Sequence, residues 1–261
     1  MTALDDAHAA MTAAPDDDRA RLGFYDRLAG AELFLLLDRE PVGDTADPRV
    51  FPAGDGRVVL AFDREERLSG FAGGVAPYLA LSGRALATLV AGEGLGVGLN
   101  FGAPSEILID ADGMEWLAAT LSATPDEVEA RFEAFRRPSA VPEALLTALD
   151  AKLATAAGRA DHAWLADADL SGGVRAHLLA FVDPAPGAEG ALAQAVGEAL
   201  TFSGLEAGWL DVAFFRRSDP AVARIARVGL RFDLPKAVGP SVQAAERSAP
   251  GSDPDRPPRL R

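Results

Sequence analysis

Short apolar runs alternate with amphipathic stretches along the first half of the chain. The runs at 32–37, 49–51, 57–62, 95–100 and 106–109 have the length and aliphatic content of strands. The stretches between them place apolar residues at helical spacing, as in a helix opened by Pro15 that carries Leu22, Tyr25 and Leu28. This succession of elements predicts an α+β domain.

Local signals predict where several of these elements begin. Gly54-Asp55-Gly56 separates two strand runs and favours a β-hairpin. Asp63 is expected to cap the helix that follows it, and Asp112 with Glu115 forms a capping-box pattern before another helix. A further helix is expected to begin at Ser82 or Gly83. The residues expected to face the core from the last two helices are Leu86, Leu89, Val90, Met114, Leu117 and Leu121.

The second half of the chain repeats this mixture of elements. Thr124-Pro-Asp-Glu127 predicts the start of a helix that would bury Val128, Phe132 and Phe135, and Pro138 and Pro142 then interrupt it. The segments that read as helices are 142–157, with Leu145, Leu149 and Leu153 on one face, 188–200 and 219–228. The segments that read as strands are 162–169, 174–182, 209–215 and 230–234.

These patterns predict two small α+β domains, each a mixed β-sheet covered by helices. The expected boundaries are 1–121 for the first domain, 122–141 for a connector and 142–234 for the second domain. Residues 235–261 contain six prolines and no apolar period, which predicts a disordered tail. This tail ends in Arg256, Arg259 and Arg261, and an extended basic segment of this kind suits docking to a protein partner.

Composition and charge narrow the classes of function. The 261 residues carry a net charge of −14, which argues against binding to nucleic acids or to anionic membrane surfaces. The chain has no cysteine, which excludes disulfides, thiolate catalysis and cysteine-ligated metals. An acidic N-terminus without a basic n-region argues against a signal peptide, so we expect a cytosolic protein.

Motifs for catalysis or cofactor binding are weak. The glycine run between Gly92 and Gly102 follows a helix and leads into a strand, which is the reverse of a dinucleotide fingerprint, so we interpret it as a strand packed closely against a neighbour. A metal site would need residues from the predicted hairpin to converge, and alternation along a strand works against this. Those residues are His162, Asp167, Asp169, His177 and Asp183. We therefore assign no catalytic, cofactor-binding or metal-binding residue.

The order of elements between Phe24 and Leu121 resembles the N-terminal domain of the SseB (enhanced serine sensitivity) family. The residues that carry this resemblance are Phe24-Tyr25, Glu32-Leu33, Val58–Phe62, Glu66-Arg67-Leu68, Tyr78, Leu86–Val90 and Gly94–Asn100. The second half resembles, less closely, the mixed α/β C-terminal domain of the same family, through Leu145–Leu153, Leu178–Val182 and Leu210–Phe215. The resemblance implies a cytosolic bacterial protein, and it supplies no catalytic residue that can be carried over.

Two hypotheses of function follow from the sequence. The first is a non-enzymatic protein-interaction or regulatory module. The alternative is a small-molecule-binding protein or weak enzyme with a site between the domains, or near the loop that runs from Phe71 to Tyr78. These two regions and the basic, proline-rich tail are where we expect function to reside.

Overall fold

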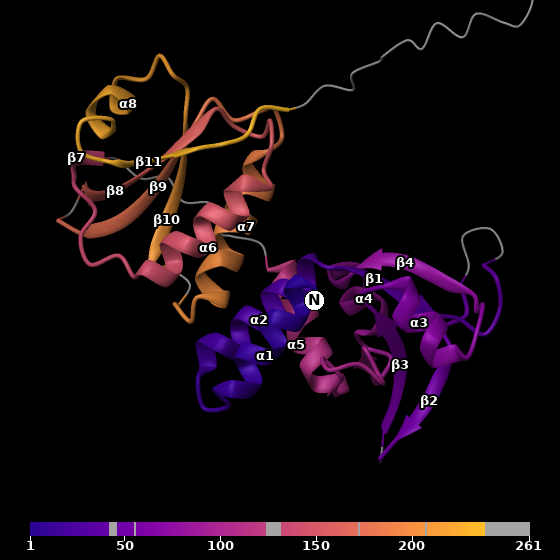
Figure 1. Ribbon diagram of the computed structural model, residues 1–261. Coiled ribbons are helices and arrows are strands. Elements are labelled where there is room, and N and C mark those ends of the chain that lie inside the picture. The colour runs from indigo at the N-terminus through magenta and orange to yellow at the C-terminus, as the bar shows by residue number, and fades with distance from the viewer. Residues whose placement is uncertain (42–45, 55, 124–131, 172, 207, 238–261) are drawn as a thin grey trace, which may run out of the picture.

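The chain folds into two mixed β-sheets whose helices lie mainly between them (Figure 1). The computed structural model describes residues 1–41, 46–54, 56–123, 132–171, 173–206 and 208–237. Within these residues the first sheet has six strands and the second has five, and each contains parallel and antiparallel pairs. The α+β class with two mixed sheets, predicted from the sequence, is confirmed.

The elements follow one another closely along the chain. The helices are α1 (Ala3–Ala13), α2 (Asp18–Gly30), α3 (Glu65–Ala72), α4 (Gly83–Val90), α5 (Ala111–Ser122), α6 (Glu143–Ala154), α7 (Glu189–Phe202) and α8 (Pro220–Ile225). The strands of the first sheet are β1 (Glu32–Leu36), β2 (Val50–Ala53), β3 (Gly56–Phe62), β4 (Tyr78–Ser82), β5 (Leu95–Leu99) and β6 (Ile107–Ile109). The strands of the second sheet are β7 (Phe132–Arg136), β8 (His162–Leu170), β9 (Arg175–Val182), β10 (Leu210–Phe215) and β11 (Leu230–Asp233).

The first sheet has strand order β4-β1-β3-β5-β6, and β2 also pairs with β3. Strands β3 and β5 are parallel, so the chain between them must cross over, and it does so through α3, β4 and α4. Gly96 lies where β5 approaches the end of β6, because a Cβ there would sit 2.4 Å from the carbonyl oxygen of Ile109. The interpretation of the glycine run as a closely packed strand is therefore confirmed at this position.

The two faces of the first sheet are covered unequally. Helices α1, α2, α4 and α5 pack on the inner face, where side chains such as Phe24, Leu86 and Leu117 are buried. The outer face carries Leu36, Leu60 and other alternate strand residues, and α3 packs on it through Leu68. Since α3 has only eight residues, it covers part of this face.

The second sheet has strand order β10-β9-β8-β11, with β7 paired to the far end of β8. Helices α6 and α7 bury Leu149, Leu192 and Val196 on its inner face. The short helix α8 places Ile225 on the other face. In Figure 1 the helical layers of the two sheets lie against each other in the middle of the molecule.

One residue from the second half of the described chain belongs to the core of the first sheet. Phe202, at the end of α7, is 5 % exposed and packs in the core cluster of the first sheet, where its ring lies 6.4 Å from that of Trp116. The helical layer of the first sheet is therefore completed by the second half of the chain.

Several local expectations were wrong. Tyr78 was expected at the end of a loop and residues 79–81 in no element, but Tyr78–Ser82 forms the edge strand β4 because it pairs along the whole length of β1. Phe132 and Phe135, expected on a helix, lie in β7 because β8 offers a free edge there, while residues 124–131 lie outside the described residues. Leu89, expected in the core, is 45 % exposed on α4.

Two predicted helix caps also lie elsewhere. Arg64, not Asp63, is the N-cap residue of α3, and Asp63 instead accepts a hydrogen bond from Arg67. The N-cap of α5 is Asp110, whose carboxylate accepts a hydrogen bond from the backbone N–H of Gly113 at 2.8 Å. The N-cap of α3 therefore lies one residue after the acid that the local pattern favoured, and the N-cap of α5 lies two residues before it.

The described part of the chain ends shortly after β11. The carbonyl of Pro235 accepts a hydrogen bond from the backbone N–H of Gly158 at 2.8 Å, so the chain still follows the second domain at this point. The rest of the predicted tail, 238–261, lies outside the described residues. Among the helices of the described segments, none is long and apolar enough to cross a bilayer.

Candidate functional site

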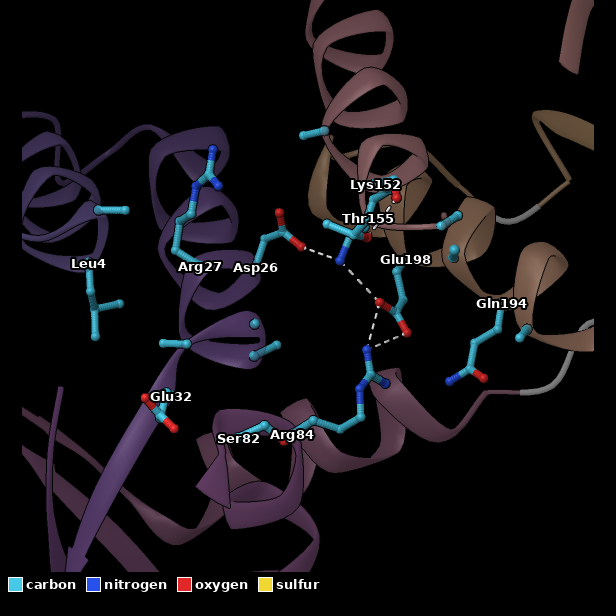
Figure 2. A pocket seen from close by; sticks show the side chains of 18 of the residues that line it. Leu4, Asp26, Arg27, Glu32, Ser82, Arg84, Lys152, Thr155, Gln194 and Glu198 are labelled. Carbon is cyan, nitrogen blue, oxygen red and sulfur yellow. Dashed lines mark hydrogen bonds and ion pairs between the residues drawn. The ribbon is translucent and has the colours of Figure 1, made fainter. Parts of the chain in front are cut away.

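A cleft of about 790 Å³ lies between the helical layers of the two sheets (Figure 2). Its walls come from the start of α1, the end of α2, the start of α4, and the facing sides of α6 and α7. We call this space the interdomain cleft. The sequence pointed to the junction between the domains as one place where function would reside, and the structure places a cleft there.

A chain of ion pairs crosses the interdomain cleft from one domain to the other. The ammonium nitrogen of Lys152 lies 2.6 Å from a carboxylate oxygen of Asp26 and 3.1 Å from Oε2 of Glu198. The guanidinium group of Arg84 donates hydrogen bonds to both oxygens of Glu198, at 2.8 and 2.9 Å. Figure 2 shows these four side chains in a row, two from each half of the chain.

Local structure explains why these four side chains meet. Arg84 occupies the first turn of α4, which begins beside the C-terminal end of α2, and Asp26 lies on that last part of α2. The two helices approach so closely that a Cβ on Gly83 would be 1.8 Å from the carbonyl oxygen of Leu28. Glu198 is only 5 % exposed, so its charge requires the two cations beside it.

The pairing limits what the charged groups of the cleft can do chemically. Glu198 accepts hydrogen bonds from Arg84 and Lys152, and Lys152 also contacts Asp26, so these groups neutralise one another. Arg27 and Arg159 also line the cleft, and within the described residues neither lies in an ion pair with an acidic side chain. A small anion entering the cleft would meet these two arginines.

A second polar cluster lies where the N-terminus of α1 meets the first sheet. Arg67 grips the Asp5 carboxylate with two nitrogens, at 2.8 and 2.7 Å, and also donates to Asp63. Hydrogen bonds from Arg67 hold the pKa of the Asp5 carboxyl well below its usual range. The hydroxyl of Ser105 donates to Asp5 and accepts from the buried amide of Asn100. The polar groups of this cluster form hydrogen bonds with one another, which fits a structural role in attaching α1 to the sheet.

The outer face of the first sheet presents aromatic side chains to its surroundings. The rings of Phe34 and Tyr78 meet edge to face at 5.3 Å, and Phe71 on α3 approaches Phe51 at 6.4 Å. Phe71 is 44 % exposed, and Leu108 on β6 is 52 % exposed. Val75, directly after α3, is fully exposed. We call this surface the outer aromatic face; it contains both ends of the Phe71–Tyr78 segment that the sequence singled out.

Acidic side chains surround one end of the outer aromatic face. A hydrogen bond to the Glu65 carboxylate raises the pKa of the Tyr78 hydroxyl, and the charges of Glu40 and Glu32 act in the same direction. Glu65 lies in the first turn of α3, whereas Glu32 begins β1 and pairs with Ser82, at the opposite end of β4 from Tyr78. The Tyr78 end of the face therefore combines half-buried aromatic rings with negative charge from Glu65 and Glu40.

The histidines and aspartates of the predicted hairpin separate into different clusters. His177 contacts Asp167 at 2.7 Å and stacks on Trp209 at 4.0 Å between ring centroids, while His162 contacts Asp161 at 2.7 Å. The carboxylates of Asp169 and Asp183 each lie in ion pairs with arginines. Within the described residues, no three potential metal ligands come together.

Comparison with known proteins locates one family in this chain. Residues 4–116 match the family model described as the SseB protein N-terminal domain. This region is an SseB N-terminal domain. The match includes α1, which the resemblance over Phe24–Leu121 left out, and it stops within α5. Neither a search of curated proteins nor a search of solved structures found a significant match.

The SseB domain contains the outer aromatic face and one wall of the interdomain cleft. The likeness of residues 142–234 to the C-terminal domain of the family stays a prediction. Sequence reasoning missed the ion-pair chain, because Asp26, Arg84, Lys152 and Glu198 belong to four different helices and form no local pattern. It also missed the strand β4, although the alternation of Leu79 and Leu81 with smaller or polar residues, directly after the predicted loop, was a usable strand signal.

Proposed function

We propose that this chain is a cytosolic bacterial protein that acts by binding another protein, without catalysing a reaction, and that the outer aromatic face is its binding surface. The observation that carries the proposal is the incomplete cover of this face. Within the described residues a single eight-residue helix packs on it, and Phe71 on that helix and Val75 shortly after it remain exposed. The aromatic side chains around the helix are half-buried.

Exposed aromatic side chains of this kind are informative. Soluble proteins keep continuous apolar patches small, and larger ones commonly mark sites of interaction. Phenylalanine and tyrosine are enriched at the centres of protein interfaces, because they bury a large area with little loss of conformational freedom. A partner that covered Phe71, Val75 and Leu108 would remove three of the large exposed apolar side chains from water.

The charges of the cleft also favour a binding role. Both carboxylate oxygens of Glu198 accept hydrogen bonds from cations of the same chain, an arrangement that suits holding two domains together. To act as a general acid or base, Glu198 would need to be unpaired and to reach a substrate. The ion pairs across the cleft therefore favour a fixed arrangement of the two domains. In this arrangement the outer aromatic face stays directed away from the second domain.

Affinity capture with matched variants tests this proposal. Tagged full-length protein is incubated with extract of its source organism, and the captured proteins are quantified by mass spectrometry. The double variant Phe71→Ser/Val75→Ser should lose most of the captured partner, because two exposed apolar side chains are replaced by small polar ones. The control Val174→Ser changes another exposed valine, in the second domain, and should capture as much as the wild type.

Two results would count against the proposal. One is recovery of the same proteins at the same level by the Phe71→Ser/Val75→Ser variant. The other is recovery of nothing above background by the wild type. Thermal unfolding of each variant confirms that its fold is retained, and both substitutions replace exposed side chains, so little loss of stability is expected.

A small-molecule-binding protein is the second candidate, and the interdomain cleft favours it. Its volume of about 790 Å³ falls in the range of ligand pockets, and Arg27 and Arg159 would attract an anionic ligand. Native mass spectrometry of protein purified from its own source would detect a bound metabolite directly. The variant Arg159→Ala should then release that ligand, whereas release by Phe71→Ser would place the ligand elsewhere.

A further inference from the structure

The outer aromatic face has the chemistry that recognises proline-rich segments. Such segments bind shallow grooves lined by aromatic rings, because they are extended before they bind. Strands β1 and β2 both pair with the edge of β3 that lies opposite β5, so the edge-to-face pairs Phe34–Tyr78 and Phe51–Phe71 form one aromatic cluster along that edge. Basic residues within such a ligand require acids nearby, and Glu65 and Glu40 supply them at the Tyr78 end.

The chain itself contains a segment of matching chemistry. After Ala237 come five prolines, and the last nine residues read DPDRPPRLR. Three arginines, at 256, 259 and 261, alternate with these final prolines in a chain whose net charge is −14. Proline, arginine and one leucine are the residue types that aromatic rings and nearby carboxylates bind.

The chain is also long enough to connect the two places. It leaves the second domain at Ala237, next to Gly158, and 24 residues follow. The last nine residues are tethered by the 15 residues 238–252. At about 3.1 Å per residue in extended form, this tether spans roughly 45 Å, which is about the width of a compact body of this size. The last nine residues can therefore reach across the molecule to the first domain.

We propose that the C-terminal segment, residues 238–261, docks on the outer aromatic face of its own chain, with the arginines at the acidic Tyr78 end. This inference rests on the proposed function, since the docked segment occupies the surface that the protein partner needs. The tail then acts as an intramolecular competitor, and a partner must displace it. Because tail and face belong to one molecule, even a weak contact is well populated.

Paramagnetic relaxation enhancement on the full-length protein tests this docking. The chain has no cysteine, so Ser252→Cys takes a single spin label in the tail. If the tail docks, amide signals of α3 and β4 lose intensity relative to the reduced label, while those of α8 keep theirs. The loss should disappear when Arg256, Arg259 and Arg261 are all changed to alanine, and it should weaken as salt screens the charges. Changing Lys236 and Arg247 to alanine, in the same tail, serves as the matched control.

Each other outcome overturns the proposal. Intensity loss elsewhere, or loss that persists after the three arginines are removed, means that the tail does not recognise this face. In a second sample, spin-labelled protein is mixed with isotope-labelled protein that carries no spin label. Intensity loss that appears only in this mixture means that the segment binds a second copy. No loss at any amide means that the tail stays free.

The test of the inference and the test of the proposed function give separable results. If the tail docks, the variant with three arginines replaced should capture more partner in the affinity experiment, because the competitor is gone. If the tail does not dock but Phe71→Ser/Val75→Ser still loses the partner, the inference fails and the proposed function stands. If the tail docks and no partner depends on the face, the proposed function fails alone.

Discussion

The ion-pair chain across the interdomain cleft predicts that Glu198→Gln will destabilise the protein. The substitution keeps the shape of the side chain and removes the charge that Arg84 and Lys152 share. Removing one partner of a buried ion pair costs about 3–5 kcal/mol, whereas an exposed pair contributes about 1 kcal/mol or less. Arg84 is 40 % exposed and Lys152 retains Asp26, so both cations remain partly compensated. We therefore expect a loss of about 2 kcal/mol in the free energy of unfolding.

Urea denaturation of the wild type and the variant measures this loss. Asp150→Asn removes an acid from the exposed side of α6, and it should change the free energy of unfolding by less than about 0.5 kcal/mol. A double-mutant cycle with Arg84→Met isolates the contribution of the pair, for which we expect a coupling energy of about 1–2 kcal/mol.

The reasoning would be refuted by additive effects in this cycle. Additivity would mean that Glu198 and Arg84 do not stabilise each other, whatever their geometry. A loss in Glu198→Gln no larger than that of Asp150→Asn would lead to the same conclusion. In either case the relation between the domains would rest on apolar packing alone.

Further predictions concern stability within the first domain. The pKa of Asp5 is lower in the folded than in the unfolded chain, so its charge stabilises the fold above the unfolded pKa of about 3.9, and this contribution fades as the pH falls below it. The difference in free energy of unfolding between wild type and Asp5→Asn should therefore shrink from pH 5 towards about pH 2, and Asp6→Asn, which changes an exposed acid, should show no such trend. Gly83→Ala should destabilise by at least about 2 kcal/mol in urea denaturation, because its Cβ meets the backbone of α2. Gly70→Ala, with open space around it, should instead stabilise α3 by up to about 1 kcal/mol; an equal effect of the two glycine substitutions would contradict the close approach. Asp110→Ala should cost about 1 kcal/mol through loss of the α5 cap, and an unchanged unfolding midpoint would place that cap elsewhere.

The elements with strong local periodicity were predictable from the sequence. The apolar stripe of α5 identified three residues that are buried, Met114, Leu117 and Leu121. In α6, Leu145, Leu149 and Leu153 are likewise buried. In both helices the spacing of apolar residues coincides with the side that packs on a sheet, so local pattern and tertiary structure agree.

Features that depend on distant partners were not predictable in this way. Phe132 and Phe135 fit helical spacing, yet they lie in a strand because an edge of β8 is available to them. The interdomain ion pairs join positions as far apart as 26 and 152, and nothing in the sequence around either position indicates the other. The outer aromatic face likewise emerges only when β1, β2, β4 and α3 are assembled around β3.

Phe202 has a consequence for how the molecule is made. Its ring belongs to the core of the first sheet, although it is encoded more than eighty residues after the last strand of that sheet. During synthesis on the ribosome, the first domain emerges and begins to fold long before this ring exists. Until α7 has left the ribosome, Trp116 and its neighbours lack the side chain that covers them, so the nascent first domain carries an apolar gap that its own sequence cannot close.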